Sequence, residues 1–334
     1  ILMRIDAGHF RISLSLCSQA LLWKTLREPS DDMHAIHHLI SKLPSTAFII
    51  FWSASLFVLL SLFLLYILRC FFHFHMVKAE FLDHIKVNYL FAPSISWILL
   101  LQSSPFIHPK STYYVVLWWV FMVPILALDV KIYGQWFTKG TFLSMVANPT
   151  SHISVIGNLV GARAAAQMGW KECAMCIFSI GIIHYLVLFV TLYQGFSGSD
   201  RLPVKLRPVF FLFFAAPSTA SLAWDSISGT FGTPSKMLFF LSMFLFASPG
   251  TRPALFKKSM RKFHVAWWAY PFPLTVLALA SAQYAEEVKG ALAHLLMLVL
   301  SGLSIIVCMG VVIFTLLNVG LFLRQHFSYI HAAA

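Results

Sequence analysis

The sequence predicts an all-α integral membrane protein with ten transmembrane helices. Of its 334 residues, 59% are hydrophobic and 11% are charged, whereas a soluble globular domain carries about 25% charged residues. The mean hydropathy is +0.79, and the apolar residues form runs long enough to cross a bilayer as helices. The formal net charge is +12. Basic residues are dispersed between the runs and form no single face, which argues against a nucleic-acid partner and leaves membrane lipid as the expected one.

The even-numbered spans are the most apolar ones and predict a lipid-facing wall. The second, fourth and tenth spans follow from the nearly unbroken apolar runs Phe48–Cys70, Tyr113–Leu128 and Leu292–Phe322. A helix that is apolar on every side is typical of a membrane span. The even-numbered spans are predicted at about 45–70, 112–132, 170–193, 235–250 and 291–323.

The odd-numbered spans are richer in Ser, Gly, Pro and His, and they predict an interior. Asn88–Ser96, Thr150–Ala166 and Ala215–Ser228 are examples. Gly157 and Gly161 form a GxxxG pattern, which predicts close approach of a neighbouring helix. The odd-numbered spans are predicted at about 9–27, 87–105, 150–168, 207–228 and 263–284. Paired with the even ones, they give one domain over residues 1–334 with hairpins at about 9–70, 87–132, 150–193, 207–250 and 263–323.

A weak internal repeat agrees with this alternation. FAPSISW, starting at Phe91, is similar to FAAPSTASLAW, starting at Phe214, and both lie near the start of an odd-numbered span. Prolines recur once per hairpin, and internal repeats with interrupted helices are typical of transport proteins. Chance similarity between apolar segments is the alternative. The repeated prolines are Pro93, Pro149, Pro217 and Pro273.

The distribution of basic residues predicts the orientation of the chain. Of the 24 Lys and Arg residues, 16 fall on the side of the chain ends and eight on the other side. Cytoplasmic loops of membrane proteins carry the excess of Lys and Arg. Both termini are therefore expected in the cytoplasm.

The segment RKFHVAWWAYPFPLT, at the start of the ninth span, places Phe272 between Pro271 and Pro273. Proline lacks an N–H, so the carbonyls of Trp267 and Ala269 are expected to lose their helical partners. The prolines also disfavour helical backbone at the residues before them. The segment therefore predicts a break near mid-membrane that lines a cavity, with a positive half-helix end suited to an anion. A simple packing kink is the alternative.

Residues for other chemistry are scarce. The chain has only twelve Asp and Glu residues, placed mostly at span ends or in loops, whereas coupled carriers usually need buried acids. His152 and His184 are the best ionisable candidates inside spans, although each is also a plausible packing residue. Cys173 and Cys176 have no second ligand pair nearby. No catalytic motif occurs, so neither enzyme activity nor a cofactor or metal site is expected.

The following motifs resemble the plant slow-type anion channels, whose superfamily includes the bacterial tellurite-resistance and dicarboxylate transporters. FRISLSLCSQALLWK and FKKSMRKFHVAWWAY are most similar to its short-tailed members. The resemblance extends from about Phe10 to Leu317. It rests on VKAEFLDHIKVNYLFAPS (77–94), DVKIYGQWF (129–137), ANPTSHISVIGNLVGA (147–162), FFAAPSTASLAW (213–224) and FHVAWWAYPFPLT (263–275).

The resemblance implies a plasma-membrane homotrimer in which five hairpins ring a pore in each subunit, odd helices inside and even helices outside. It implies chloride and nitrate as cargo and a gating phenylalanine at Phe272. The cytoplasmic mouth is expected at Lys78, Lys86 and Arg252. The candidate pore-lining residues are Phe91, Pro93, Leu99, Ser151, His152, Phe214, Pro217 and Ser218.

Three departures from the family pattern bear on gating. Ala79 follows Lys78 where the family has a basic pair, Leu99 stands where it has a second pore aromatic, and Pro271 replaces the usual Ser or Thr. Pro271 is expected to hold the phenylalanine firmly, which predicts a channel nearly silent at rest. Two alternatives stay open. One is a poorly conducting subunit that modulates a longer-tailed family member, and the other is a proton-coupled dicarboxylate carrier.

Overall fold

The structure is a computed structural model, and it describes residues 2–3, 5–27, 45–138, 148–195, 204–250 and 264–318. Within these ranges the chain is all-helical, as predicted. Among the described residues, five helical segments are long and apolar enough to cross a membrane, in agreement with an integral membrane protein. They are Thr46–Phe72, Thr112–Gln135, Lys171–Tyr193, Val265–Val288 and Ala291–Leu317.

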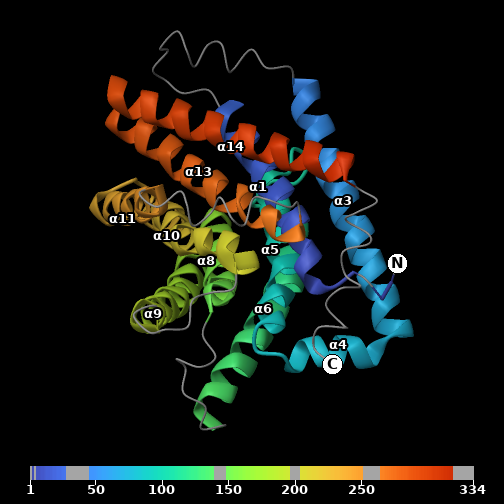
Figure 1. The fold of residues 1–334 in the computed structure, drawn as a ribbon. Helices are drawn as coiled ribbons and strands as arrows, with labels where there is room; N and C mark the ends of the chain where they lie inside the picture. The colour runs from blue at the N-terminus through green and yellow to red at the C-terminus, as the bar shows by residue number, and fades with distance from the viewer. Residues whose placement is uncertain are drawn as a thin grey trace.

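Within the described ranges, five helices form the interior, and we call them the inner helices. Each packs against two others, so that contacts run from α1 to α5, α8, α10, α13 and back to α1 in a closed ring (Figure 1). The segment Val265–Val288 shows their burial, because 89% of its most apolar window is buried. The inner helices are α1 (Phe10–Arg27), α5 (Phe91–Ser103), α8 (His152–Gln167), α10 (Leu212–Ser228) and α13 (Pro271–Val288).

In the part of the chain that the structure describes, five outer helices surround this ring (Figure 1). Each packs on the inner helix that precedes it in the chain and on the next inner helix around the ring. Their outward faces carry exposed apolar side chains, and only 17% of the most apolar window of Thr46–Phe72 is buried. In water such a surface would be unfavourable, whereas lipid accommodates it. The outer helices are α3 (Ser45–Phe72), α6 (Thr112–Thr138), α9 (Lys171–Gly195), α11 (Thr233–Gly250) and α14 (Ala291–Leu317).

A 3₁₀ helix stands directly before every inner helix. Consecutive 3₁₀ helices contact one another, so the N-termini of all five inner helices lie at the same end of the ring. The repeated prolines belong to this feature: Pro93 and Pro273 lie in the first turns of α5 and α13, and Pro149 begins η3, whereas Pro217 lies inside α10. The 3₁₀ helices are η1 (Ala7–His9), η2 (Lys86–Leu90), η3 (Pro149–Ser151), η4 (Val204–Phe211) and η5 (Val265–Ala269).

The GxxxG pattern of α8 marks a close approach to α6, as predicted. A Cβ atom at Gly161 would lie 2.5 Å from the sulfur of Met122. The carbonyl of Gly161 accepts a hydrogen bond from the indole N–H of Trp118, at 3.1 Å. A glycine here lets the α6 side chains reach the α8 backbone. The contact holds an outer helix to the ring.

Candidate functional site

The two prolines around Phe272 begin a helix and do not break one. Pro271 is the first residue of α13, and η5 ends two residues before it. The first four N–H groups of a helix have no intrahelical acceptor, so proline fits there without losing a hydrogen bond. The expected break in mid-helix is therefore wrong, and the change from 3₁₀ to α-helix lies at the start of α13.

The backbone before the prolines also differs from expectation. The carbonyl of Trp267 accepts a hydrogen bond from the N–H of Tyr270 at 3.1 Å, so it keeps a partner. Tyr270 has helical dihedrals, with φ −80° and ψ −46°, although the following proline disfavours them. In a 3₁₀ turn a carbonyl pairs with the N–H three residues later, whereas the prediction had considered only the four-residue spacing of an α-helix. Phe272 thus sits on ordered backbone.

Phe272 belongs to the hydrophobic core of the ring. Its side chain is 1% exposed, and α13 packs against both α1 and α10. Pro271 and Pro273 are buried beside it. An aromatic ring in a dry site excludes water and hydrated ions together. The geometry is therefore suited to an apolar constriction.

Side chains from two other helices hold the segment before Phe272. The hydroxyl of Ser15 on α1 donates to the carbonyl of Trp268 at 3.1 Å. The indole N–H of Trp268 donates to the hydroxyl of Thr315 on α14, also at 3.1 Å. The N–H of Ala266 donates to Nδ1 of His264, which caps η5. These contacts join the start of α13 to α1 and α14.

The other predicted pore-lining residues lie on the inner helices or on η3. All are buried except Pro93, which is partly buried. The Ser218 hydroxyl donates to the carbonyl of Phe214 at 3.0 Å and lies 2.5 Å from the Ser242 hydroxyl on α11. This contact directs Ser218 toward an outer helix. The remaining residues of the group are Phe91, Leu99, Ser151, His152 and Pro217.

His152, at the start of α8, is surrounded by aromatic rings. Its Nδ1 lies 3.2 Å from the carbonyl of Pro149. Its ring centroid lies 4.5 Å from that of Phe213 and 5.8 Å from that of Tyr185. These contacts fit the packing role that the sequence left open for His152. Ser151 precedes it at the end of η3.

Two of the three residues predicted for the basic mouth lie near the end of the ring where the inner helices begin. Lys78 on α4 (Phe74–Leu82) and Lys86 at the start of η2 are both exposed to solvent. Arg252 lies outside the described residues. The two lysines lie on the elements that precede α5, and both are basic side chains that could attract anions there.

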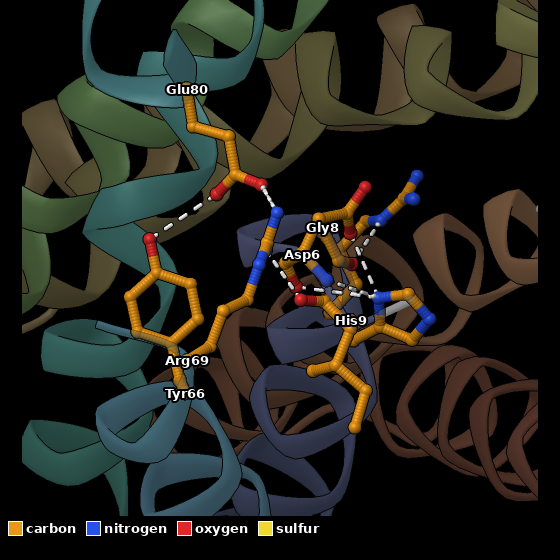
Figure 2. A network of polar contacts seen from close by, with 8 residues as sticks. Asp6, Gly8, His9, Tyr66, Arg69 and Glu80 are labelled. Atoms are coloured by element: carbon orange, nitrogen blue, oxygen red, sulfur yellow. Dashed lines mark hydrogen bonds and ion pairs between the residues drawn. The ribbon is translucent and has the colours of Figure 1, made fainter. Parts of the chain in front are cut away.

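A buried ion pair holds α4 in place (Figure 2). Nη2 of Arg69, at the end of α3, lies 2.6 Å from Oε1 of Glu80 on α4, and both side chains are almost fully buried. The hydroxyl of Tyr66 donates to Oε2 of Glu80 at 3.2 Å, and Nη1 of Arg69 donates to the carbonyl of Ile5. Glu80 follows the expectation that acidic residues lie mostly at span ends or in loops, but its buried partner was not predicted. The pair orients α4, and with it Lys78.

A second buried acid was missed by the sequence argument. Asp129 lies in the apolar segment Thr112–Gln135 of α6 and is 4% exposed, and this burial was not predicted. Its Oδ2 accepts a hydrogen bond from the side-chain amide of Asn158 on α8, at 2.8 Å. Asn158 is fully buried. The contact crosses from an outer helix to an inner one, and no periodicity in the sequence indicates it.

With the gating phenylalanine that the family resemblance implies at Phe272, replacing Pro271 with serine is expected to raise the basal current. Proline fixes φ at the first residue of α13. Ordering the backbone of one residue costs about 1–2 kcal/mol, so releasing part of that restraint favours the open arrangement by up to about 1 kcal/mol, or about two- to fivefold in current. Basal current at matched surface expression measures the effect. A lower current in Pro271→Ser would mean that the proline holds the phenylalanine ring aside.

Comparison with known proteins identifies the family of this chain. The family described as voltage-dependent anion channel (SLAC1) matches residues 4–316. The chain is 57% identical to S-type anion channel SLAH1 of Arabidopsis thaliana, over 97% of this chain and 84% of that protein. It is 56% identical to S-type anion channel SLAH4, over 97% and 87% of the two chains.

A longer relative matches the same region. The chain is 42% identical to guard cell S-type anion channel SLAC1 of Arabidopsis thaliana, over 95% of this chain and 56% of that protein. These names describe channels, a class without enzyme activity. Because the match covers nearly the whole described bundle, this chain belongs to the S-type anion channel family.

Proposed function

We propose that this chain is a plasma-membrane channel for chloride and nitrate, with a pore along the axis of the inner ring that Phe272 closes. Ten transmembrane helices, arranged as five hairpins, would form this pore. The observation that carries the proposal is the closed ring of inner helices, which places Phe272 on an interior helix. The proposal also rests on the family to which the chain belongs.

Anion selectivity in this proposal comes from diffuse positive potential. The chain carries a formal net charge of +12, and the inner helices all begin at one end of the ring. Helix N-termini carry partial positive charge, which favours anions within the first turn. Lys78 and Lys86 are exposed at this same end. Together these features would concentrate small anions at the entrance.

We also propose that the chain forms a homotrimer with one pore in each subunit and both termini in the cytoplasm. The ring of inner helices closes within a single chain, so a pore needs no residue from a second copy. The exposed apolar faces of the outer helices would then contact lipid or neighbouring subunits. Mass measurement of the purified protein in nanodiscs tests the trimer.

Current recordings in oocytes test the function directly. Cells that express the chain alone are expected to show small basal currents, because Phe272 closes the pore, and the reversal potential of these currents should follow the chloride or nitrate gradient. Uptake of a labelled dicarboxylate that saturates and depends on a proton gradient would instead indicate a coupled carrier. Current only on co-expression with a longer-tailed relative would indicate a modulatory subunit.

Neutralising Lys78 and Arg252 together, with glutamine, is expected to lower the current about two- to fivefold at low salt. Basic side chains at a mouth raise the local anion concentration, and salt screens this effect over about 8 Å at physiological ionic strength. The loss should therefore fade as cytoplasmic salt is raised, which excised-patch recordings measure. Lys110→Gln is the matched control, because Lys110 is exposed in the segment after α5, at its opposite end. Equal currents at every salt concentration would leave these residues only an orienting role.

A further inference from the structure

A buried polar cluster lies about one turn of α13 after Phe272. The side-chain amide nitrogen of Gln19 on α1 donates to the hydroxyl of Thr275 on α13 at 3.0 Å. It also lies 2.7 Å from the hydroxyl and 3.2 Å from the carbonyl of Ser304 on α14. The hydroxyls of Thr275 and Ser304 are 3.0 Å apart. All three side chains are at most 1% exposed.

The geometry fixes the orientation of the Gln19 amide. Turning it over would place the amide oxygen 3.2 Å from the carbonyl oxygen of Ser304, an unfavourable contact between two acceptors. In the observed orientation Oε1 has no hydrogen-bond partner among the described residues. A buried acceptor without a donor costs stability. Packing alone does not explain a glutamine at this position, because an apolar side chain would fill the same space without burying an unpaired acceptor.

The cluster connects to the backbone on which Phe272 stands. The Thr275 hydroxyl donates to the carbonyl of Pro271 at 2.8 Å, one turn back along α13. One turn earlier on α1 than Gln19, Ser15 donates to the carbonyl of Trp268. Helix α1 thus holds the chain on both sides of Phe272. The first turn of α13 cannot rotate without breaking these contacts.

We propose that Gln19 is a positioning residue for the Phe272 gate, acting through Thr275 to hold the first turn of α13 in the closed arrangement. This inference rests on the proposed gating role of Phe272. Hydrogen bonds in a dry interior are stronger than in water, so a single amide can bias the gate. Gln19 acts on the position of the Phe272 side chain and carries no charge. Its loss should therefore change how often the pore is open and not which anion it prefers.

The test replaces Gln19 with methionine, which keeps an unbranched side chain of similar size and removes the hydrogen bonds. Gln19→Met is expected to raise basal current about two- to tenfold at matched surface expression, with an unchanged nitrate-to-chloride permeability ratio. Gln102→Met is the matched control. Gln102 is also a buried glutamine on an inner helix, and its amide donates to the carbonyl of Val160 at 3.2 Å, away from α13.

A double-mutant cycle with Phe272→Ala separates positioning from a general loosening of the bundle. If Gln19 acts through the Phe272 side chain, Gln19→Met raises the basal current less than twofold in the Phe272→Ala background. An equal increase in both backgrounds, or an equal increase in Gln102→Met, would overturn the inference. Phe272→Ala without increased current would instead overturn the gate itself, and with it this inference.

Thr275→Val provides a second route if Gln19→Met does not reach the cell surface. Valine keeps the shape of threonine but removes the hydroxyl that joins Gln19 to the carbonyl of Pro271. The same increase in basal current and the same lack of additivity with Phe272→Ala are expected. Wild-type current in Thr275→Val at normal surface expression would contradict the inference.

Discussion

Alanine in place of Phe272 is expected to raise anion current on the order of ten- to a hundredfold without changing anion selectivity. The ring is 1% exposed in the core of the inner helices. Burying a phenylalanine side chain is worth about 1.5–3 kcal/mol, and this favours the dry, closed arrangement. A methyl group leaves room for water, so the constriction becomes wet and conducts. Selectivity should persist because the substitution removes no charge.

Two controls distinguish a gate from a damaged fold. Surface biotinylation should show equal amounts of wild type and Phe272→Ala. Phe239→Ala is the matched core variant, because Phe239 is fully buried but lies on the outer helix α11. Its ring stacks on that of Tyr284, near the far end of α13, with 5.0 Å between the centroids. Phe239→Ala should lower expression without raising current per channel. Unchanged or reduced current in Phe272→Ala at normal surface expression would rule out the phenylalanine gate.

Hydropathy predicted the outer helices best. The spans expected at 45–70 and 291–323 correspond to α3, Ser45–Phe72, and α14, Ala291–Leu317. Long apolar runs specify such helices because lipid surrounds most of their surface. The inner helices were found mainly from their small and polar residues. Their 3₁₀ starts were not predicted, since a 3₁₀ turn depends on local hydrogen bonds that many sequences can make.

The site was only partly predictable, for a different physical reason. Phe272 between two prolines is a local pattern and could be read directly. Gln19 and Thr275 are 256 residues apart in the chain, and Asp129 and Asn158 are 29 apart. Hydrogen bonds between such residues depend on which helices become neighbours. A single sequence contains no periodicity that encodes these pairs.

The ion pair between Arg69 and Glu80 is another contact of this kind, and breaking it should have a large effect on stability. Replacing Arg69 with methionine would leave the carboxylate of Glu80 buried without its cation. Its remaining side-chain partner would be the hydroxyl of Tyr66. Removing one partner of a buried pair costs about 3–5 kcal/mol. Arg69→Met is therefore expected to lower the melting temperature in detergent strongly and to reduce surface expression.

The double variant Arg69→Met/Glu80→Leu should recover much of this loss, because replacing both charges by apolar groups removes the unpaired carboxylate. Fluorescence-detected size-exclusion after heating measures all three proteins. The partly exposed pair between Lys236 and Glu287, with 3.7 Å between its charged atoms, is the control, and Lys236→Met should cost about 0–1 kcal/mol. If the double variant is less stable than Arg69→Met, the pair stabilises α4 beyond charge neutralisation, and the explanation given for Arg69→Met fails.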